Sequence, residues 1–194
     1  MIELKGVNKS FQQRRILKNI NLEITKGETL AIIGASGSGK STLLRLIIGL
    51  LKPDDGEIWI KNKEISNLPE KELNEVRLNM GMVFQYSALF DSMTIGDNVA
   101  FGLREHTTLS EAEIKEIVQE NLRMVDLAGF ENMMPNELSG GMKKRVSLAR
   151  AIAFKPDILL YDEPSAGLDP IMSAKIDELI YHMQQKLGVT SIVV

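Results

Sequence analysis

A short segment rich in glycine and serine constrains the fold of this chain more than any other feature. The segment spans residues 34–42 and lies between the strand-like apolar run Thr29–Ile33 and the helix-like apolar run Leu43–Leu51. Its spacing, G-x-x-x-x-G-K-[ST], is that of a phosphate-binding loop, which requires this strand–loop–helix context. A flexible Gly/Ser turn is the alternative, but the flanking elements favour a nucleotide site.

Each residue type in this segment suits the binding of nucleotide phosphates. The glycines let the backbone turn tightly and aim consecutive N–H groups inward, and the N-terminus of the following helix adds the positive end of a dipole. Lys40 can reach the β- and γ-phosphates, and the hydroxyl of Ser41 can bind Mg²⁺. The predicted binding residues are Gly34, Ala35, Ser36, Gly37, Ser38, Gly39, Lys40, Ser41 and Thr42.

A second candidate is the apolar run Ile158–Tyr161, which ends in two carboxylates. A strand of a parallel sheet delivers its carboxyl-terminal residues to the crevice where ligands bind. Asp162 would hold Mg²⁺ through water, and Glu163 could polarise an attacking water as general base. Two acids after an apolar run more often begin a solvated loop, but downstream of a phosphate-binding loop they indicate a metal–nucleotide site.

Strand-like and helix-like segments alternate along the rest of the chain. Ile20–Ile24 alternates apolar and polar residues, Glu57–Ile60 follows a turn, and Met80–Phe84 and Ser191–Val194 are apolar runs typical of buried parallel strands. Residues of about 94–154 are predicted to be helical. One predicted helix opens with a capping box at Ser110 and Glu113 and continues with apolar residues at helical spacing: Ile114, Ile117, Val118, Leu122 and Val125.

The composition excludes several classes of protein. With 44% hydrophobic and 25% charged residues, the 194-residue chain has the make-up of a globular domain. A net charge of −3 provides no overall basic field for nucleic acid, and the absence of cysteine excludes disulfides and thiolate metal sites and fits a reducing cytoplasm. The first residues, Met1–Lys5, lack the pattern of a signal peptide, and Leu43–Leu51 is too short to span a bilayer.

The turn Leu138–Met142 precedes a run of three cations, Lys143, Lys144 and Arg145. Cations at a helix N-terminus oppose the helix dipole unless an anion binds there, and a solvated basic face is the alternative.

The motifs occur in the order found in ATP-binding cassette (ABC) ATPases: the phosphate-binding loop, Gln85, Leu138–Met142, Asp162–Glu163 and Ser165–Asp169. The chain resembles that family over essentially its whole length. The resemblance implies an α/β P-loop NTPase (RecA-like) fold with a mostly parallel core sheet, a small antiparallel β portion and an inserted helical subdomain. It also implies ATP and Mg²⁺ as ligands, and ATP hydrolysis. We expect one domain over residues 1–194, in which 1–87 and 155–194 form the nucleotide-binding core and 88–154 the helical subdomain.

The resemblance implies a role for each matching residue. Ser139, Gly140 and Gly141 resemble the signature residues that contact the γ-phosphate held by a second ABC subunit, which implies a head-to-tail dimer. Gln85 resembles the glutamine that contacts Mg²⁺ and the attacking water, and Asp169 resembles the aspartate that crosses the dimer interface. The implied catalytic residues are Glu163, Gln85 and Lys40, and the implied metal ligands are Ser41, Gln85 and Asp162.

Other positions match the pattern of the ABC family less closely. Phe11 resembles the aromatic residue that stacks on adenine, although by residue type a phenylalanine is more often core. Met142 stands where many members of the family have glutamine. The family's switch histidine follows the last strand, where this chain stops, which we interpret as truncation. His106 and His182 lie elsewhere in the sequence, so the chain as given lacks a group expected for efficient hydrolysis.

Four segments are similar to the ATPase subunit of bacterial Mla/Mce-type lipid transporters: Gln85–Phe90, Asp97–Phe101, Leu103–Thr107 and Leu138–Arg145. This similarity implies transmembrane permease subunits and lipid-binding accessory proteins as partners, no nucleic acid, and a peripheral location on the cytoplasmic side of the inner membrane. Apolar residues near Gln85, most of them methionines or aromatic residues, are candidates for receiving a permease helix. They are Met80, Met82, Phe84, Tyr86, Leu89, Phe90 and Met93, of which Met82 and Phe84 are expected in the core.

Two other functions compete with transport. An ABC ATPase acting on nucleic acid or the ribosome is disfavoured by the net negative charge and the single phosphate-binding loop. Glu163 argues against a nucleotide-binding regulator without turnover, whereas the missing switch histidine leaves this function open for residues 1–194.

Overall fold

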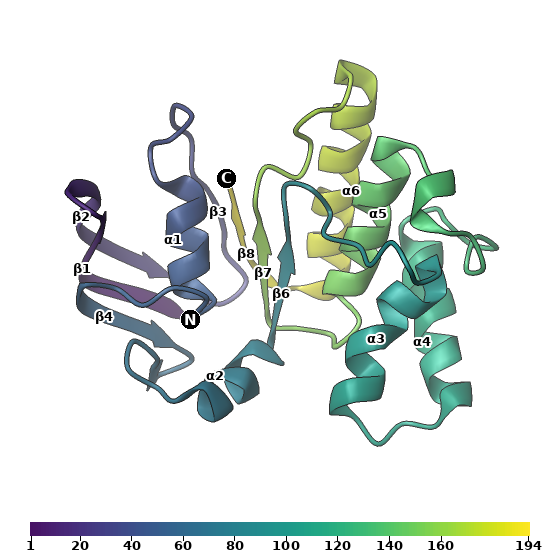
Figure 1. The fold of residues 1–194 in the computed structure, drawn as a ribbon, viewed down its shortest axis with the longest axis horizontal. Coiled ribbons are helices and arrows are strands. Elements are labelled where there is room, and N and C mark those ends of the chain that lie inside the picture. Colours follow the sequence, from purple (N-terminus) through teal and green to yellow (C-terminus); the bar gives the residue numbers. More distant parts are fainter.

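Two four-stranded sheets of different kinds organise residues 1–194, all of which the computed structural model describes (Figure 1). The first sheet is antiparallel, in the order β2–β1–β4–β5. Its strands are β1 (Ile2–Phe11), β2 (Arg14–Ile24), β4 (Asp55–Ile60) and β5 (Lys63–Glu64). Alternate residues of β1, including Ile2 and Leu4, face the core, as expected for a sheet with one solvated face.

The second sheet is parallel, in the order β3–β8–β7–β6. Its strands are β3 (Thr29–Ala31), β8 (Thr190–Val193), β7 (Ile158–Tyr161) and β6 (Met80–Val83). In the register, Leu160 pairs with Met82 on one side and Ile192 on the other. Every residue of β6 and β7 is buried, which explains why these strands are uniformly apolar. Because the four strands are parallel, their carboxyl ends lie at one edge of the sheet.

The helices are α1 (Lys40–Ile47), α2 (Glu70–Arg77), α3 (Ile95–His106), α4 (Glu111–Met124), the 3₁₀ turn η1 (Pro135–Glu137), α5 (Gly140–Ala151) and α6 (Pro170–Leu187). In Figure 1 the N-termini of α1, α5 and α6 lie at the same end of the molecule as the carboxyl ends of the parallel strands. No helix is long and apolar enough to cross a bilayer.

The parallel sheet separates two hydrophobic clusters. Leu159 and Tyr161 of β7 belong to the cluster that also contains the buried faces of α3, α4, α5 and α6. Ile158 and Leu160, on the other face of β7, belong to the cluster that contains α1 and the antiparallel sheet. The alternation of side chains along one strand therefore joins the helical region to the phosphate-loop side of the molecule.

The predicted fold class is confirmed, with differences at the ends of elements. The strand predicted over Thr29–Ile33 is shorter, and the helix predicted over Leu43–Leu51 begins at Lys40 and ends at Ile47. Gly49, with φ 73°, turns the chain out of the helix. The sequence analysis missed β1, β5 and α2. The capping box is present, since Ser110 accepts from the Glu113 N–H and the Glu113 carboxylate accepts from the Ser110 N–H.

Candidate functional site

The phosphate-binding loop connects β3 to α1 across the carboxyl edge of the parallel sheet. Gly39 is the N-cap of α1 and has φ 101°, in the region that favours glycine. A Cβ atom there would lie 2.8 Å from Cγ2 of Ile16, on β2. Both the conformation and the packing against the antiparallel sheet therefore require glycine at this position.

The ammonium of Lys40 lies inside the bend of this loop. Its Nζ donates to the carbonyl oxygens of Gly34 at 2.8 Å and Ala35 at 3.2 Å. The same Nζ lies 3.9 Å from Oε1 of Glu163. The cation is thus held between the start of the loop and the carboxylate of Glu163, which follows the end of β7.

Ser41 and Asp162 meet across the edge of the sheet. The Ser41 hydroxyl donates to Oδ1 of Asp162 at 2.7 Å, and the Asp162 residue is only 3% exposed. The Asp162 N–H donates to the carbonyl of Val83, which fixes the chain beside the end of β6. A hydroxyl and a carboxylate in contact form an all-oxygen pair of the kind that Mg²⁺ prefers, so these two residues fit that ion.

Gln85 and Glu163 form a second pair, next to the first. The Gln85 Nε2 donates to Oε2 of Glu163 at 2.8 Å. Glu163 has φ 46°, a left-handed conformation that is uncommon for a residue other than glycine. The structure therefore brings together all five side chains predicted for catalysis and metal binding: Lys40, Ser41, Gln85, Asp162 and Glu163.

Lys144 also belongs to this cluster, and the sequence analysis did not place it there. Its side chain is buried, and Nζ donates to the carbonyl of Gln85 and, at 3.5 Å, to that of Glu163. Burial lowers the pKa of the Lys144 ammonium, and the charges of Asp162 and Glu163 oppose this shift. Arg145 donates to the carbonyls of Val125 and Asp126 at 3.3 Å. The interpretation of the basic run as a solvated face is therefore wrong for Lys144, which is buried and donates to carbonyl groups of this chain.

The signature residues begin α5. Ser139 is the N-cap and accepts from the Met142 N–H at 3.3 Å, while Gly140 and Gly141 form the first turn. A Cβ on Gly141 would lie 2.6 Å from Cε of Met172, so α6 packs directly on this turn. The Met142 side chain packs against the helical-region cluster.

Asp169 caps α6, since its Oδ1 accepts from the N–H groups of Ile171 and Met172, both at 3.0 Å. No hydrogen bond or ion pair joins Asp169 or the residues 139–141 to the loop 34–42.

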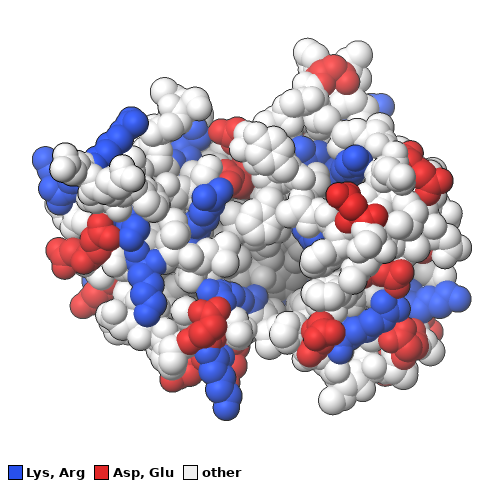
Figure 2. Space-filling view, in the orientation of Figure 1, with Lys and Arg blue, Asp and Glu red and all other residues white.

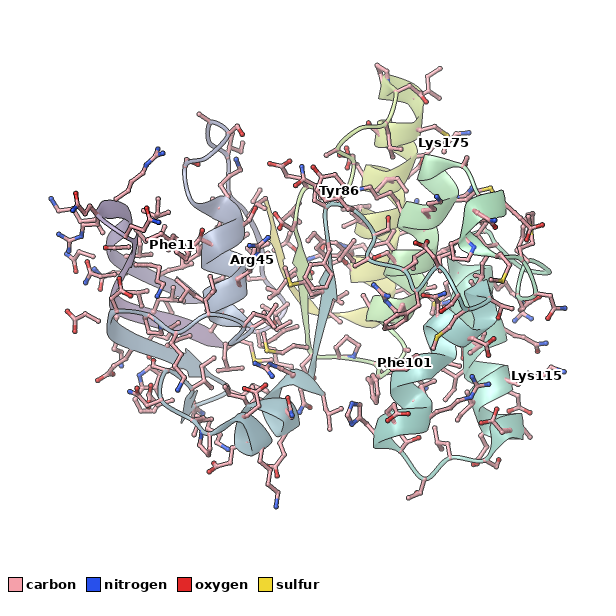
Figure 3. The ribbon with its side chains drawn as sticks, viewed as in Figure 1. Phe11, Arg45, Tyr86, Phe101, Lys115 and Lys175 are labelled. Atoms are coloured by element: carbon pink, nitrogen blue, oxygen red, sulfur yellow. The ribbon has the colours of Figure 1, made fainter.

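Phe11 ends β1 beside the turn into β2, and at 45% exposure it is not a core residue. Lys9 Nζ lies 5.7 Å from the centre of its ring. Figure 3 shows Phe11 in the antiparallel sheet on one side of α1. The histidines lie away from Glu163: His106 ends α3 with its ring 6.4 Å from that of Phe154, and His182 lies on α6 beside Glu178.

An apolar groove of about 410 Å³ opens between β6 and α3. Its lining includes Phe84, Phe90, Phe101 and Phe154, and the rings of Phe90 and Phe101 are 4.8 Å apart. Figure 2 shows a hollow at the centre of this face with mostly uncharged walls, and Figure 3 shows Phe101 on the side of α3 that faces the sheet.

The structure corrects part of the predicted surface around Gln85. Met82 is buried, as expected for a core residue. Tyr86 is 87% exposed but does not line the groove. Leu89 is half-buried, packs against the helical-region cluster and does not line the groove.

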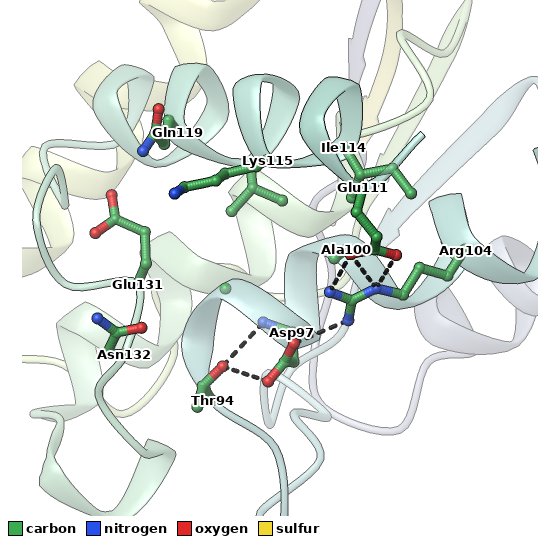
Figure 4. A pocket seen from close by; sticks show the side chains of 12 residues that line it. Thr94, Asp97, Ala100, Arg104, Glu111, Ile114, Lys115, Gln119, Glu131 and Asn132 are labelled. Carbon is green, nitrogen blue, oxygen red and sulfur yellow. Dashed lines mark hydrogen bonds and ion pairs between the residues drawn. The ribbon is translucent and has the colours of Figure 1, made fainter. Parts of the chain in front are cut away.

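A separate polar cavity of about 500 Å³ lies between α3 and α4 (Figure 4). Arg104 crosses it, and its guanidinium donates to Glu111 at 2.9 Å and to Asp97 at 2.8 Å. Because the side chain of Arg104 bonds both carboxylates, it ties the end of α3 to the start of α4.

Comparison with known proteins shows which family has this sequence. A profile of the ABC transporter family matches residues 17–166. The chain is 46% identical over 193 residues to the probable ribonucleotide transport ATP-binding protein mkl of Mycobacterium leprae, a match covering 100% of this chain and 56% of that protein. It is 48% identical over 194 residues to the intermembrane phospholipid transport system ATP-binding protein MlaF of Haemophilus influenzae, covering 100% and 74%. The chain thus spans little more than half the length of the mycobacterial relative.

Among solved structures, the chain is similar to the ATP-binding cassette MJ0796 in a dimeric post-hydrolysis state bound to ADP and Pi. The TM-score is 0.92 at 39% identity, covering 100% of this chain and 87% of that one.

Proposed function

The chain belongs to the ABC transporter family, and from that premise we propose that it binds and hydrolyses ATP to power transport through a membrane permease. One observation carries the proposal. Lys40, Ser41, Gln85, Asp162 and Glu163 converge at the carboxyl edge of the parallel sheet, beside a loop whose form suits phosphates.

The proposed division of labour follows from these contacts. The loop N–H groups and the Lys40 ammonium bind the β- and γ-phosphates, and Ser41 with Asp162 holds Mg²⁺, together with Gln85. When bound, Mg²⁺ offsets the negative charge of the phosphates. Glu163 accepts a proton from the water that attacks the γ-phosphorus, while the bond to the bridging oxygen of the β-phosphate breaks. Gln85 orients the Glu163 carboxylate through its amide.

A second copy of the chain would complete the site. Ser139, Gly140 and Gly141 lie at the same end of the molecule as the phosphate-binding loop without contacting it (Figure 1). Head-to-tail pairing would place these residues of one copy over the nucleotide of the other, with Asp169 at the interface. Phe11, being half exposed, is free to stack on adenine.

The groove between β6 and α3 supports a permease as partner. Its phenylalanine walls suit an apolar helix, which would hold the chain peripherally at the cytoplasmic side of the inner membrane. We propose phospholipid or a related lipid as cargo, with lipid-binding accessory proteins. The similarity to MlaF, which is named for phospholipid transport, supports lipid as the cargo. The mycobacterial relative is named for ribonucleotide transport, so ribonucleotides are the competing cargo.

Reconstitution of the full-length protein with its permease tests both the ATPase assignment and the assignment of lipid as cargo. We expect ATP turnover that depends on Lys40 and is stimulated by phospholipid acceptor vesicles but not by ribonucleotides. Stimulation by ribonucleotides alone would overturn the lipid assignment and leave the ATPase assignment standing. Nucleotide binding without turnover, in the presence of the permease, would overturn the ATPase assignment.

A further inference from the structure

Helix α5 contacts the segment Gln85–Ala88 through two cationic side chains. Near the start of the helix, Lys144 donates to the carbonyl of Gln85. At its last turn, Arg150 donates to the carbonyls of Ser87 at 2.8 Å and Ala88 at 2.6 Å. Three carbonyl groups of one short segment are therefore bound from one helix.

Three of the residues whose carbonyl groups these cations bind have a strained backbone. Ser87 has φ 61°, Ala88 has φ 47° and Glu163 has φ 46°, all in the left-handed region. Such conformations persist in residues other than glycine only where the surroundings hold them. Here the carbonyl of each of the three residues accepts a hydrogen bond from Lys144 or Arg150.

We propose that Lys144 and Arg150 are positioning residues for the ATPase reaction. They hold the segment Gln85–Ala88, in which Ser87 and Ala88 are strained, and the strained Glu163 in place, so that the Gln85 amide stays 2.8 Å from the Glu163 carboxylate. Ala88 and Arg150 also line the apolar groove. The contacts made by Lys144 and Arg150, which we call the clamp, therefore connect the wall of the groove to the proposed general base, Glu163. The inference rests on the proposed ATPase function and adds two residues to it.

Lys143 provides a matched control. It is the neighbour of Lys144 on α5 and carries the same charge, but its side chain is partly exposed and makes no hydrogen bond or ion pair. Lys144→Met and Lys143→Met therefore remove the same charge from adjacent positions, and only the first removes the contact with Gln85.

The experiment compares Lys144→Met, Lys144→Arg and Lys143→Met in the full-length protein. For Lys144→Met we expect kcat to fall about tenfold or more, with KM and the Kd for ATP changed by less than about twofold. Amide hydrogen exchange of residues 85–88 should accelerate in the same variant, because the segment loses an anchor. Lys144→Arg should restore most of the rate, and Lys143→Met should match the wild type.

Arg150→Lys, which retains the charge but not the two-carbonyl grip, tests the other anchor. Because both anchors act on one segment, Lys144→Met combined with Arg150→Lys should slow turnover by less than the product of the separate effects. Unchanged kcat and unchanged exchange at 85–88 in Lys144→Met would overturn the inference. Loss of protection spread over the whole chain, with a lower Tm, would show a purely structural role and also overturn it. If the wild type does not turn over, the proposed function fails, while the local exchange still tests the clamp.

Discussion

At the scale of single residues, Lys40 tests the nucleotide assignment most directly. Its ammonium is the cation nearest the expected phosphates and is already enclosed by the loop. Lys40→Ala should weaken ATP binding about tenfold or more, which corresponds to roughly 1.4 kcal/mol or more of binding free energy. Equilibrium titration with a fluorescent ATP analogue measures this, with the exposed Lys52→Ala as control. An affinity within twofold of the wild type would contradict the assignment of residues 34–42.

Glu163 separates binding from chemistry. Glu163→Gln keeps the shape of the side chain but removes the proton acceptor, so turnover should fall by roughly 10²–10⁴ while ATP still binds. Because ATP then persists in the site, the dimer should accumulate and be visible by size-exclusion chromatography with ATP. The exposed Glu116→Gln on α4 is the control. Hydrolysis at the wild-type rate would show that Glu163 is not the base.

At the scale of elements, Gly81 sets how closely α5 approaches β6. A Cβ at this position would lie 2.2 Å from the carbonyl oxygen of Ala151, at the end of α5. Gly81→Ala should therefore lower the free energy of unfolding by about 1–3 kcal/mol, the usual effect of overpacking. Urea unfolding measures the change. Gly140→Ala is the control, since its Cβ would meet Leu168 at an ordinary 3.5 Å, and an equal loss in both variants would refute the packing argument.

Phe101 on α3 tests the groove as a docking element. Phe101→Asp places a charge on the groove wall, so capture of the permease in a pull-down should fall while ATP affinity and Tm stay close to the wild type. Tyr181→Asp is the control, because Tyr181 is 59% exposed on α6 and does not line the groove. Full permease capture by Phe101→Asp would remove the groove from the account of partner binding.

At the scale of the whole molecule, stability should depend on pH through the junction of α3 and α4. Hydrogen bonds from Thr94 and Arg104 lower the pKa of Asp97, and those from Arg104 lower the pKa of Glu111. Carboxylates with a lowered pKa in the folded state stabilise it above their ordinary values of 3.8 and 4.5, and this stabilisation is lost as the pH falls through the folded pKa. The free energy of unfolding should therefore decline below about pH 4.5.

Arg104→Met checks this origin, because it removes the partner shared by both carboxylates. Urea unfolding of the variant should show a smaller decline between neutral and acidic pH than the wild type. Control measurements on Arg123→Met, in the last turn of α4 and outside this network, should reproduce the wild-type decline. An unchanged decline in Arg104→Met would place the acid sensitivity elsewhere.

The sequence by itself determined the features that depend on near neighbours along the chain. The phosphate-binding loop, the apolar strand before Asp162 and the capping box at Ser110 are each defined within a few residues, because backbone geometry and local hydrogen bonds set them. The family resemblance added Gln85 and the signature turn. The ends of the elements were less predictable, as Gly49 and the three-residue β3 show, since packing decides where a helix or strand stops.

Only the tertiary structure decided which side chains meet across long separations. Nothing local in the run Lys143–Arg145 distinguishes Lys144, yet its burial and its bond to the carbonyl of Gln85, 59 residues away, separate it from its neighbours. The same holds for Leu89, which packs against the helical-region cluster, and for Phe101 on the groove wall. The physical reason is that sequence periodicity shows which face of an element is apolar, whereas the partner of a buried cation follows from how the sheet and helices pack.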